Sequence, residues 1–103
     1  MAFTTSLSVS DDKATIELIG ELDSGAAPKL HEAIEEAIRS DVSCLELRAS
    51  SLTYMSSAGL RALLFARQKM GEEGSVVLLG APEVVTRTVR LAGLERSIHL
   101  TDA

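Results

Sequence analysis

Apolar and polar residues alternate in two runs near the amino terminus. In residues 3–9, Phe, Thr, Leu and Val occupy one side of the pattern, while Thr and Ser occupy the other. A second alternating run, residues 14–18, follows a polar turn at residues 10–13, and we expect it to end near Gly20. A period of two is typical of half-buried strands, so this region predicts an antiparallel hairpin.

The apolar spacing becomes helical after residue 25. Apolar residues recur along one helical face, at positions 27, 30, 34 and 38. Charged residues occupy the other faces, which is typical of an amphipathic helix. We expect Asp23 or Ser24 to cap this helix, and Pro28 is compatible with its first turn.

Two segments are predicted to be central strands: the short β-rich stretch at residues 42–47 and the continuous apolar run at residues 76–79. Between them, apolar residues spaced by three and four positions from Leu60 predict a second helix that ends near Gly71.

The last part of the chain predicts one more helix and one more strand. The helix is expected to begin at Pro82 and to stop at Gly93, and residues 97–100 can add the strand. The full order is therefore β-β-α-β-α-β-α-β, which predicts an α/β fold in a single domain, residues 1–103. We expect a mixed sheet of four to five strands, right-handed crossovers and about three helices packed on the sheet.

Composition and charge narrow the range of partners. Apolar residues make up 46% of the 103 residues, enough to build one core, whereas aromatic residues make up only 3%. The net charge is −5, and ten of the fifteen acidic residues fall within the first fifty. This sign disfavours binding to nucleic acid or to an anionic membrane. The sequence shows no signal peptide and no membrane-spanning run, so we expect a cytoplasmic protein. We also expect a monomer.

Common enzyme motifs are absent from the sequence. No phosphate-binding or dinucleotide-binding glycine loop is present, and the serines at 56–57 do not lie in a Gly-x-Ser-x-Gly turn. His31, His99 and the single cysteine, Cys44, are isolated from one another in sequence. We therefore expect no catalytic residue, no metal site and no cofactor.

The segment 54–60, YMSSAGL, stands between the third predicted strand and the second predicted helix. A serine here can act as the N-cap, accepting a hydrogen bond from a free amide of the first turn. An N-cap requires only one serine, but the small residues at 56–59 also leave a helix end that another protein can approach closely. The free amides and the helix dipole also favour an anion at this position, such as a phosphate.

Two motifs resemble a known family over essentially the whole chain. Residues 20–23 (GELD) and residues 52–61 (LTYMSSAGLR) are similar to the corresponding segments of the STAS domain of bacterial anti-sigma factor antagonists. The resemblance implies a sheet with helices packed against it and a function as an anti-anti-sigma factor. It also implies that the serine before the Ala-Gly-Leu step is phosphorylated. The matching residue here is Ser57, with Ser56 as the alternative.

The resemblance further implies partner switching. The unphosphorylated antagonist binds an anti-sigma factor that is a serine kinase, which releases the sigma factor; phosphorylation ends the binding, and a serine phosphatase restores it. We expect the docking surface to surround the phosphorylated serine and to comprise Gly20, Glu21, Leu22, Asp23, Ser56, Ala58, Gly59 and Arg61.

The chain departs from the family pattern at two positions. Ser56 stands where the family usually has Asp, and Arg48 stands where an acid is frequent near the end of the third strand. Arg48 can pair with the phosphate, with Glu46 or with Asp23, and an ordinary surface pair is favoured. Two other functions also remain open: a constitutive STAS adaptor subunit of a transport or scaffold complex, and a small-ligand or nucleotide binder that uses the helix start as an anion site.

Overall fold

The computed structural model describes residues 2–102, and within them the strands and helices follow the predicted order. The strands are β1 (Thr4–Ser10), β2 (Lys13–Leu22), β3 (Cys44–Met55), β4 (Ser75–Leu79) and β5 (His99–Thr101). The helices are α1 (Ala27–Arg39), α2 (Ser57–Met70) and α3 (Glu83–Leu91), and a short 3-10 helix, η1 (Leu94–Arg96), precedes β5.

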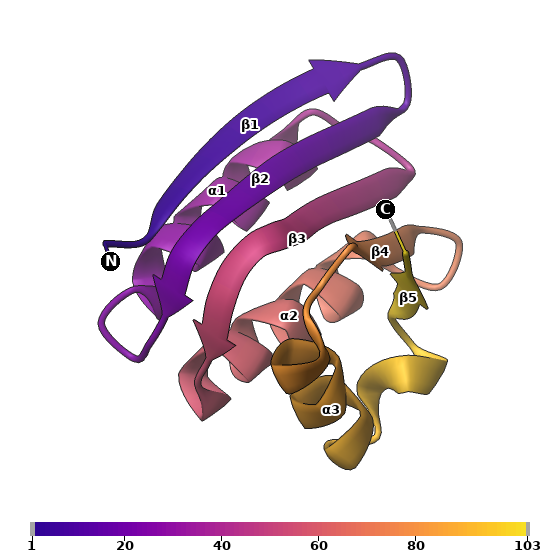
Figure 1. The fold of residues 1–103 in the computed structure, drawn as a ribbon. Coiled ribbons are helices and arrows are strands. Elements are labelled where there is room, and N and C mark those ends of the chain that lie inside the picture. The colour runs from indigo at the N-terminus through magenta and orange to yellow at the C-terminus, as the bar shows by residue number, and fades with distance from the viewer. Residues whose placement is uncertain (1, 103) are drawn as a thin grey trace.

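The five strands form one mixed sheet in the order β1-β2-β3-β4-β5 (Figure 1). β1 and β2 form the expected antiparallel hairpin, whose turn contains Asp11 in the left-handed region at a φ of 54°. β2, β3, β4 and β5 are parallel to one another. The prediction of an α/β fold with a mixed sheet is therefore confirmed.

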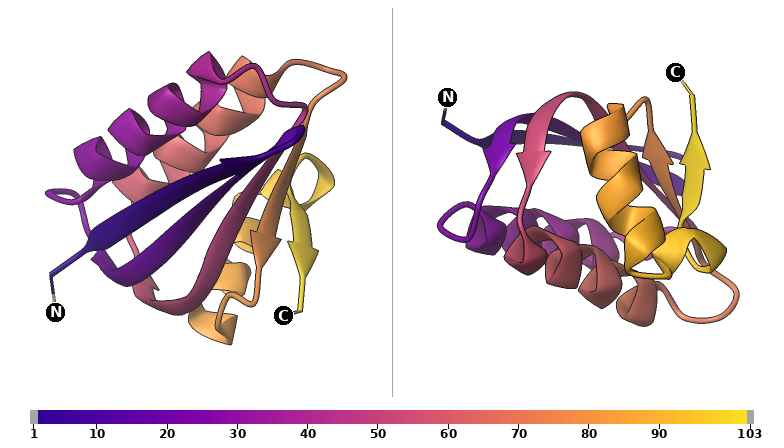
Figure 2. Two further views of the ribbon diagram at one scale, coloured as in Figure 1. Left: turned by 90° about the horizontal axis from the view of Figure 1, so that it is seen from above. Right: turned by 60° about the horizontal axis from the view of Figure 1, so that its bottom comes forward.

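The helices cover both faces of the sheet. α1 and α2 lie side by side on one face, whereas α3 lies on the other and packs against β3 (Figure 2). The alternating apolar residues of β2 and β3 form one buried cluster with the apolar faces of α1 and α2. Its largest fully buried side chains include Ile16, Leu18, Leu30, Ile34, Leu45, Leu47 and Leu63. No helix within residues 2–102 is long and apolar enough to cross a membrane.

The third strand differs most from its prediction. It was expected at residues 42–47, but β3 begins at Cys44 and continues to Met55. Its second half pairs only with β2, because β4 reaches no further than Arg48 in the register. Two register shifts interrupt the β2–β3 pairing, between Glu17 and Ile19 and between Gly20 and Glu21. These irregularities interrupt the alternation of inward-facing and outward-facing residues by which a strand is recognised in a sequence.

Two helix caps also differ from their predictions. The expectation that Asp23 or Ser24 occupies the N-cap of α1 is wrong, because Ala26 is the N-cap and makes no side-chain cap bond. Asp23 instead accepts the Ala26 amide from outside the helix, at 2.9 Å to Oδ1 and 3.1 Å to its backbone carbonyl oxygen. Pro82 is the N-cap of α3 rather than its first helical residue, while Gly93, at a φ of 76°, ends α3 as expected.

Candidate functional site

The two motifs singled out in the sequence lie side by side in the structure. Because β2 and β3 are parallel neighbours, their carboxyl ends meet, with Leu22 opposite Met55. The Ser56 amide donates a hydrogen bond to the Leu22 carbonyl oxygen at 2.8 Å. The Thr53 hydroxyl donates to the Gly20 carbonyl oxygen at 3.1 Å. The start of α2 is thereby attached to the end of β2.

Two glycines allow this close approach. A Cβ at Gly59 would lie 2.7 Å from Cγ of the fully buried Leu22, so only glycine lets the first turn of α2 pack on that side chain. Gly20 has a φ of 103°, and a Cβ there would lie 2.5 Å from the Ala2 carbonyl oxygen. Gly20, Leu22 and Gly59 are all buried, so they shape the predicted docking surface from beneath.

The two serines occupy different environments. Ser56 is the N-cap of α2, and its half-buried hydroxyl accepts a hydrogen bond from the Gly59 amide at 3.2 Å. Ser57 is the first residue of the helix and is exposed. Its hydroxyl has no hydrogen-bond partner among residues 2–102. Ser56 is therefore the cap, and Ser57 carries the accessible hydroxyl.

Exposed charged residues lie at the end of β2 and in the first turns of α2. Glu21, Asp23 and Arg61 are exposed, and Ala58 is half-buried. Arg61 lies four residues after Ser57, which places the two side chains on the same face of α2.

A groove between α1 and α2 adjoins this surface. It has a volume of about 530 Å³, and its lining includes Ser24 from the turn before α1 together with Ala58 and Arg61 from α2. Sequence analysis did not assign His31 and Phe65 to the site, although both line the groove and their rings stack with centroids 3.8 Å apart. A contact between two helices far apart in sequence leaves no local signal.

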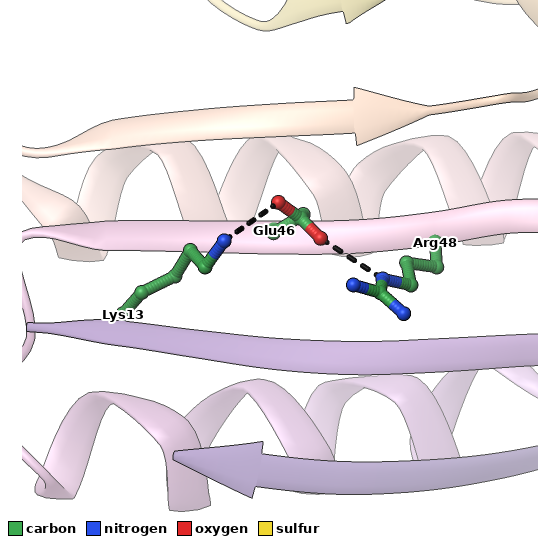
Figure 3. A network of polar contacts seen from close by, with 3 residues as sticks. All are labelled: Lys13, Glu46 and Arg48. Carbon is green, nitrogen blue, oxygen red and sulfur yellow. Dashed lines mark hydrogen bonds and ion pairs between the residues drawn. The ribbon is translucent and has the colours of Figure 1, made fainter. Parts of the chain in front are cut away.

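Arg48 takes the ordinary pairing that the sequence favoured. Its Nε donates to Glu46 Oε1 at 3.0 Å, and Lys13 Nζ donates to Glu46 Oε2 at 3.2 Å (Figure 3). The hydrogen bond from Arg48 lowers the pKa of Glu46 most; partial burial opposes this shift, and Lys13 adds to the lowering. Arg48 lies seven residues before the end of β3, roughly 20 Å from the start of α2 at 3.3 Å per residue, so it does not reach Ser57.

Metal binding finds no support in the part of the chain that the structure describes. Within residues 2–102, no three His, Cys, Asp or Glu side chains lie close enough together to hold a metal ion.

These features define a class of small α/β domain with an accessible serine at a helix start. The family model described as "Mlab, STAS domain" matches residues 5–102, and the chain belongs to this family of STAS domains. The resemblance noted in the sequence is thus confirmed at the level of the family.

Several anti-sigma factor antagonists are similar to this chain. The anti-sigma-F factor antagonist RsfB of Mycobacterium tuberculosis is 25% identical over 99 residues, which cover 96% of this chain and 81% of RsfB. The crystal structure of an anti-sigma factor antagonist from Mycobacterium paratuberculosis matches with a TM-score of 0.88 and 25% identity, over 97% of this chain and 86% of that one.

The anti-sigma factor antagonist SpoIIAA is a further structural neighbour. Its unphosphorylated form matches with a TM-score of 0.75 and 25% identity, over 99% of this chain and 89% of SpoIIAA. The phosphorylated form of SpoIIAA, described as a Bacillus cell fate determinant, has a TM-score of 0.74 and the same identity, over 99% of this chain and 91% of that one.

Proposed function

We propose that this protein is an anti-sigma factor antagonist controlled by phosphorylation of Ser57. The observation that carries the proposal is the exposed, unbonded Ser57 hydroxyl at the start of α2, in a chain similar over nearly its whole length to anti-sigma factor antagonists. One such neighbour, SpoIIAA, has been solved in both phosphorylated and unphosphorylated forms, and this supports the phosphorylation step.

The hydrogen bonds at the helix start favour Ser57 over Ser56 as the acceptor. A kinase needs a hydroxyl that it can reach and reorient, and the Ser57 side chain meets this need because it is exposed. The Ser56 hydroxyl already accepts the Gly59 amide, so phosphorylation there would disrupt the cap. A phosphate on Ser57 would lie near the first-turn amides of α2, where the helix dipole stabilises an anion.

Phosphorylation would change the docking surface in two ways. A phosphate adds about −1.5 to −2 charges and three acceptor oxygens in place of one small hydroxyl. Arg61, on the same face of α2, would be drawn towards the phosphate and away from a bound partner. The larger phosphate would obstruct a partner that approaches the small residues at the start of α2, and it would repel the exposed carboxylate of Asp23 at the neighbouring end of β2.

The proposed cycle needs two other proteins. An anti-sigma factor serine kinase binds the unphosphorylated form and phosphorylates Ser57, and a serine phosphatase regenerates that form. In this proposal the exchange takes place in the cytoplasm. The chain acts as a single STAS domain that binds its partners and catalyses no reaction, and it needs no metal and no cofactor.

The acceptor is tested by phosphorylation in vitro. The protein is incubated with the anti-sigma factor kinase and ATP, and intact-mass spectrometry counts the phosphates. We expect one phosphate on the wild type and on the S56A variant, and none on S57A. Labelling of S57A at a single site would refute Ser57 as the acceptor.

Partner release is tested by calorimetry with the anti-sigma factor. The unphosphorylated wild type and S57A are expected to bind, and the phosphorylated wild type is expected not to. If both phosphorylation states bind equally, the switch is excluded. Recovery of transport or scaffold subunits in a pull-down from the native cell would then favour the constitutive adaptor.

A further inference from the structure

β1 forms an open edge of the sheet. Among residues 2–102 it pairs only with β2, so the backbone groups on its outer side have no strand partner (Figure 1). The opposite edge, β5, has three residues, whereas β1 has seven. β1 is therefore the longer template for an additional strand.

The edge lacks the features that normally prevent strand addition. Proteins protect such edges with lysines, prolines or bulges, but residues 2–10 contain neither a charged residue nor a proline. The β1–β2 register is continuous from Thr4 to Ser10, without a bulge. Val9 is 44% exposed on this strand.

We propose that β1 is a homodimer interface, in which the β1 strands of two copies pair antiparallel to form one continuous sheet. The strand is self-complementary about Leu7. A two-fold axis there places Thr5 opposite Val9 of the second copy and Ser6 opposite Ser8, so the apolar face continues as an apolar face. No like charges meet along the strand.

Helix α1 supplies charge complementarity to the same arrangement. A groove of about 260 Å³ runs between β1 and α1, lined by Thr5 and Leu7 and by the charged Lys29, Glu32 and Glu36. Because α1 connects the parallel strands β2 and β3, it runs antiparallel to both of them and therefore in the same direction as β1. The two-fold axis that makes the two β1 strands antiparallel also makes the two α1 helices antiparallel.

In this arrangement the start of one α1 faces the end of the other. Lys29 of each copy then lies towards Glu36 of the second copy, which forms two symmetric pairs of opposite charge. Surface pairs of this kind add little affinity but fix the orientation of the two copies.

The dimer leaves the candidate docking site accessible. Ser57 and Arg61 belong to α2, whereas the dimer forms along the outer side of β1 and α1. The dimer is therefore independent of the proposed function, although it departs from the monomer that the sequence alone predicts.

Sedimentation equilibrium of the full chain, from micromolar to millimolar concentration, tests the interface. The variant S6K/S8K places lysines on the exposed side of the edge, where within one copy they adjoin Glu17 and Thr15. Across the two-fold axis they face each other, and we expect the dissociation constant to rise roughly tenfold or more. Circular dichroism and urea unfolding verify that this variant folds.

The matched control, S50K/S97K, adds the same charge at exposed residues of β3 and of the turn before β5, which belong to neither β1 nor α1. We expect it to dimerise like the wild type. The proposal is overturned if the wild type stays monomeric over the whole concentration range. It is also overturned if S6K/S8K leaves the dissociation constant of the dimer unchanged, or if both variants raise it equally.

A charge exchange tests the two-fold orientation at low salt. K29E alone puts like charges opposite each other and should weaken the dimer several-fold, and K29E/E36K should restore it. If K29E leaves the dissociation constant unchanged, or the double variant stays as weak as the single one, the proposed arrangement is wrong.

Discussion

At the scale of single residues, the two adjacent serines at the start of α2 differ in their hydrogen bonding. The Ser56 hydroxyl accepts the Gly59 amide and completes the first turn of α2, while the Ser57 hydroxyl stays exposed. Capping and the proposed phosphorylation would compete for one hydroxyl if a single serine did both, and two adjacent serines allow the two functions to be separate. The two roles can therefore be measured separately.

We expect S56A to lower the free energy of unfolding by about 0.5–2 kcal/mol, because it removes the N-cap acceptor of α2. S57A should lower it much less, since the Ser57 hydroxyl makes no bond within residues 2–102. Urea unfolding followed by circular dichroism compares the two variants. A larger loss in S57A than in S56A would reverse the assignment of the cap.

Asp23 combines a structural bond with an exposed charge. Its Oδ1 accepts the Ala26 amide, so a lysine at this position would disturb the turn as well as the charge. D23N retains an acceptor oxygen and removes only the charge. We expect D23N to fold like the wild type and to weaken binding of the anti-sigma factor roughly tenfold, about 1.4 kcal/mol.

The matched control for D23N is E73Q, which removes one charge from the exposed turn after α2. Calorimetry should show little change in binding for E73Q. Equal effects of the two substitutions would move the docking surface away from the end of β2.

The Glu46 ion pairs make stability depend on pH. Arg48 and Lys13 hold the pKa of Glu46 below its ordinary value of 4.5, so the folded state favours the ionised carboxylate more than the unfolded state does. This contribution is present above pH 4.5 and is lost as the pH falls below it towards the lower pKa of the folded state.

We therefore expect E46Q to be less stable than the wild type near neutral pH, with the difference shrinking as the solution is acidified below the ordinary pKa of Glu46. Urea unfolding at a series of pH values measures this, with E73Q as the control for loss of a carboxylate. A difference that is the same at every pH would show that the ion pairs do not contribute.

At the scale of secondary-structure elements, the site depends on how closely α2 approaches β2. The Ser56–Leu22 backbone bond and the packing of Gly59 on Leu22 hold the start of α2 against the end of β2. Leu22 is fully buried, so close packing prevents its side chain from moving away from α2. A small change at Gly59 should therefore displace the whole helix start.

We expect G59A to destabilise the protein, because overpacking costs about 1–3 kcal/mol and the gain in helix propensity is at most about 1 kcal/mol. It should also weaken partner binding, since Ser57 and Arg61 move with α2. The control is G25A, whose new Cβ would lie 3.5 Å from Asp23 Oδ1, an ordinary contact. If urea unfolding shows no difference between G59A and the wild type, the close packing does not constrain α2.

At the scale of the whole molecule, one arginine connects the second half of the chain. The Arg67 guanidinium, on α2, donates to the carbonyl oxygens of Gly71 and Gly74 in the turn before β4, the latter at 2.8 Å. It also donates to the Ser97 carbonyl oxygen at 3.4 Å, just before β5. One planar side chain thus connects α2, the turn that follows it and the distant segment before β5.

We expect R67A to lower the free energy of unfolding by about 2 kcal/mol, since hydrogen bonds from a charged donor are lost, one of them part-buried. Hydrogen exchange should show that β5 loses more protection than β2. R87A, on the exposed face of α3, is the control and should have little effect. Unchanged exchange in β5 would show that Arg67 does not hold this strand.

The sequence by itself determined the order of the elements, and this order follows from local preferences. Residues 10–13 favour a tight turn, apolar residues spaced by three and four favour a helix, and Gly71 and Gly93 terminate helices. The motif around Ser57 was also visible, because a helix start depends on a few consecutive residues. These features need no knowledge of what lies across the fold.

Only the tertiary structure decided which residues meet. β3 extends to Met55 because β2 continues to pair with it past two register shifts, and the polar residues after Leu47 carry no apolar alternation that would indicate this. Three features each depend on a contact in the folded chain: the capping of α2 by Ser56, the pairing of Arg48 with Glu46 and the stacking of His31 on Phe65. Such contacts depend on strand register and helix packing, which the sequence of a single segment does not specify.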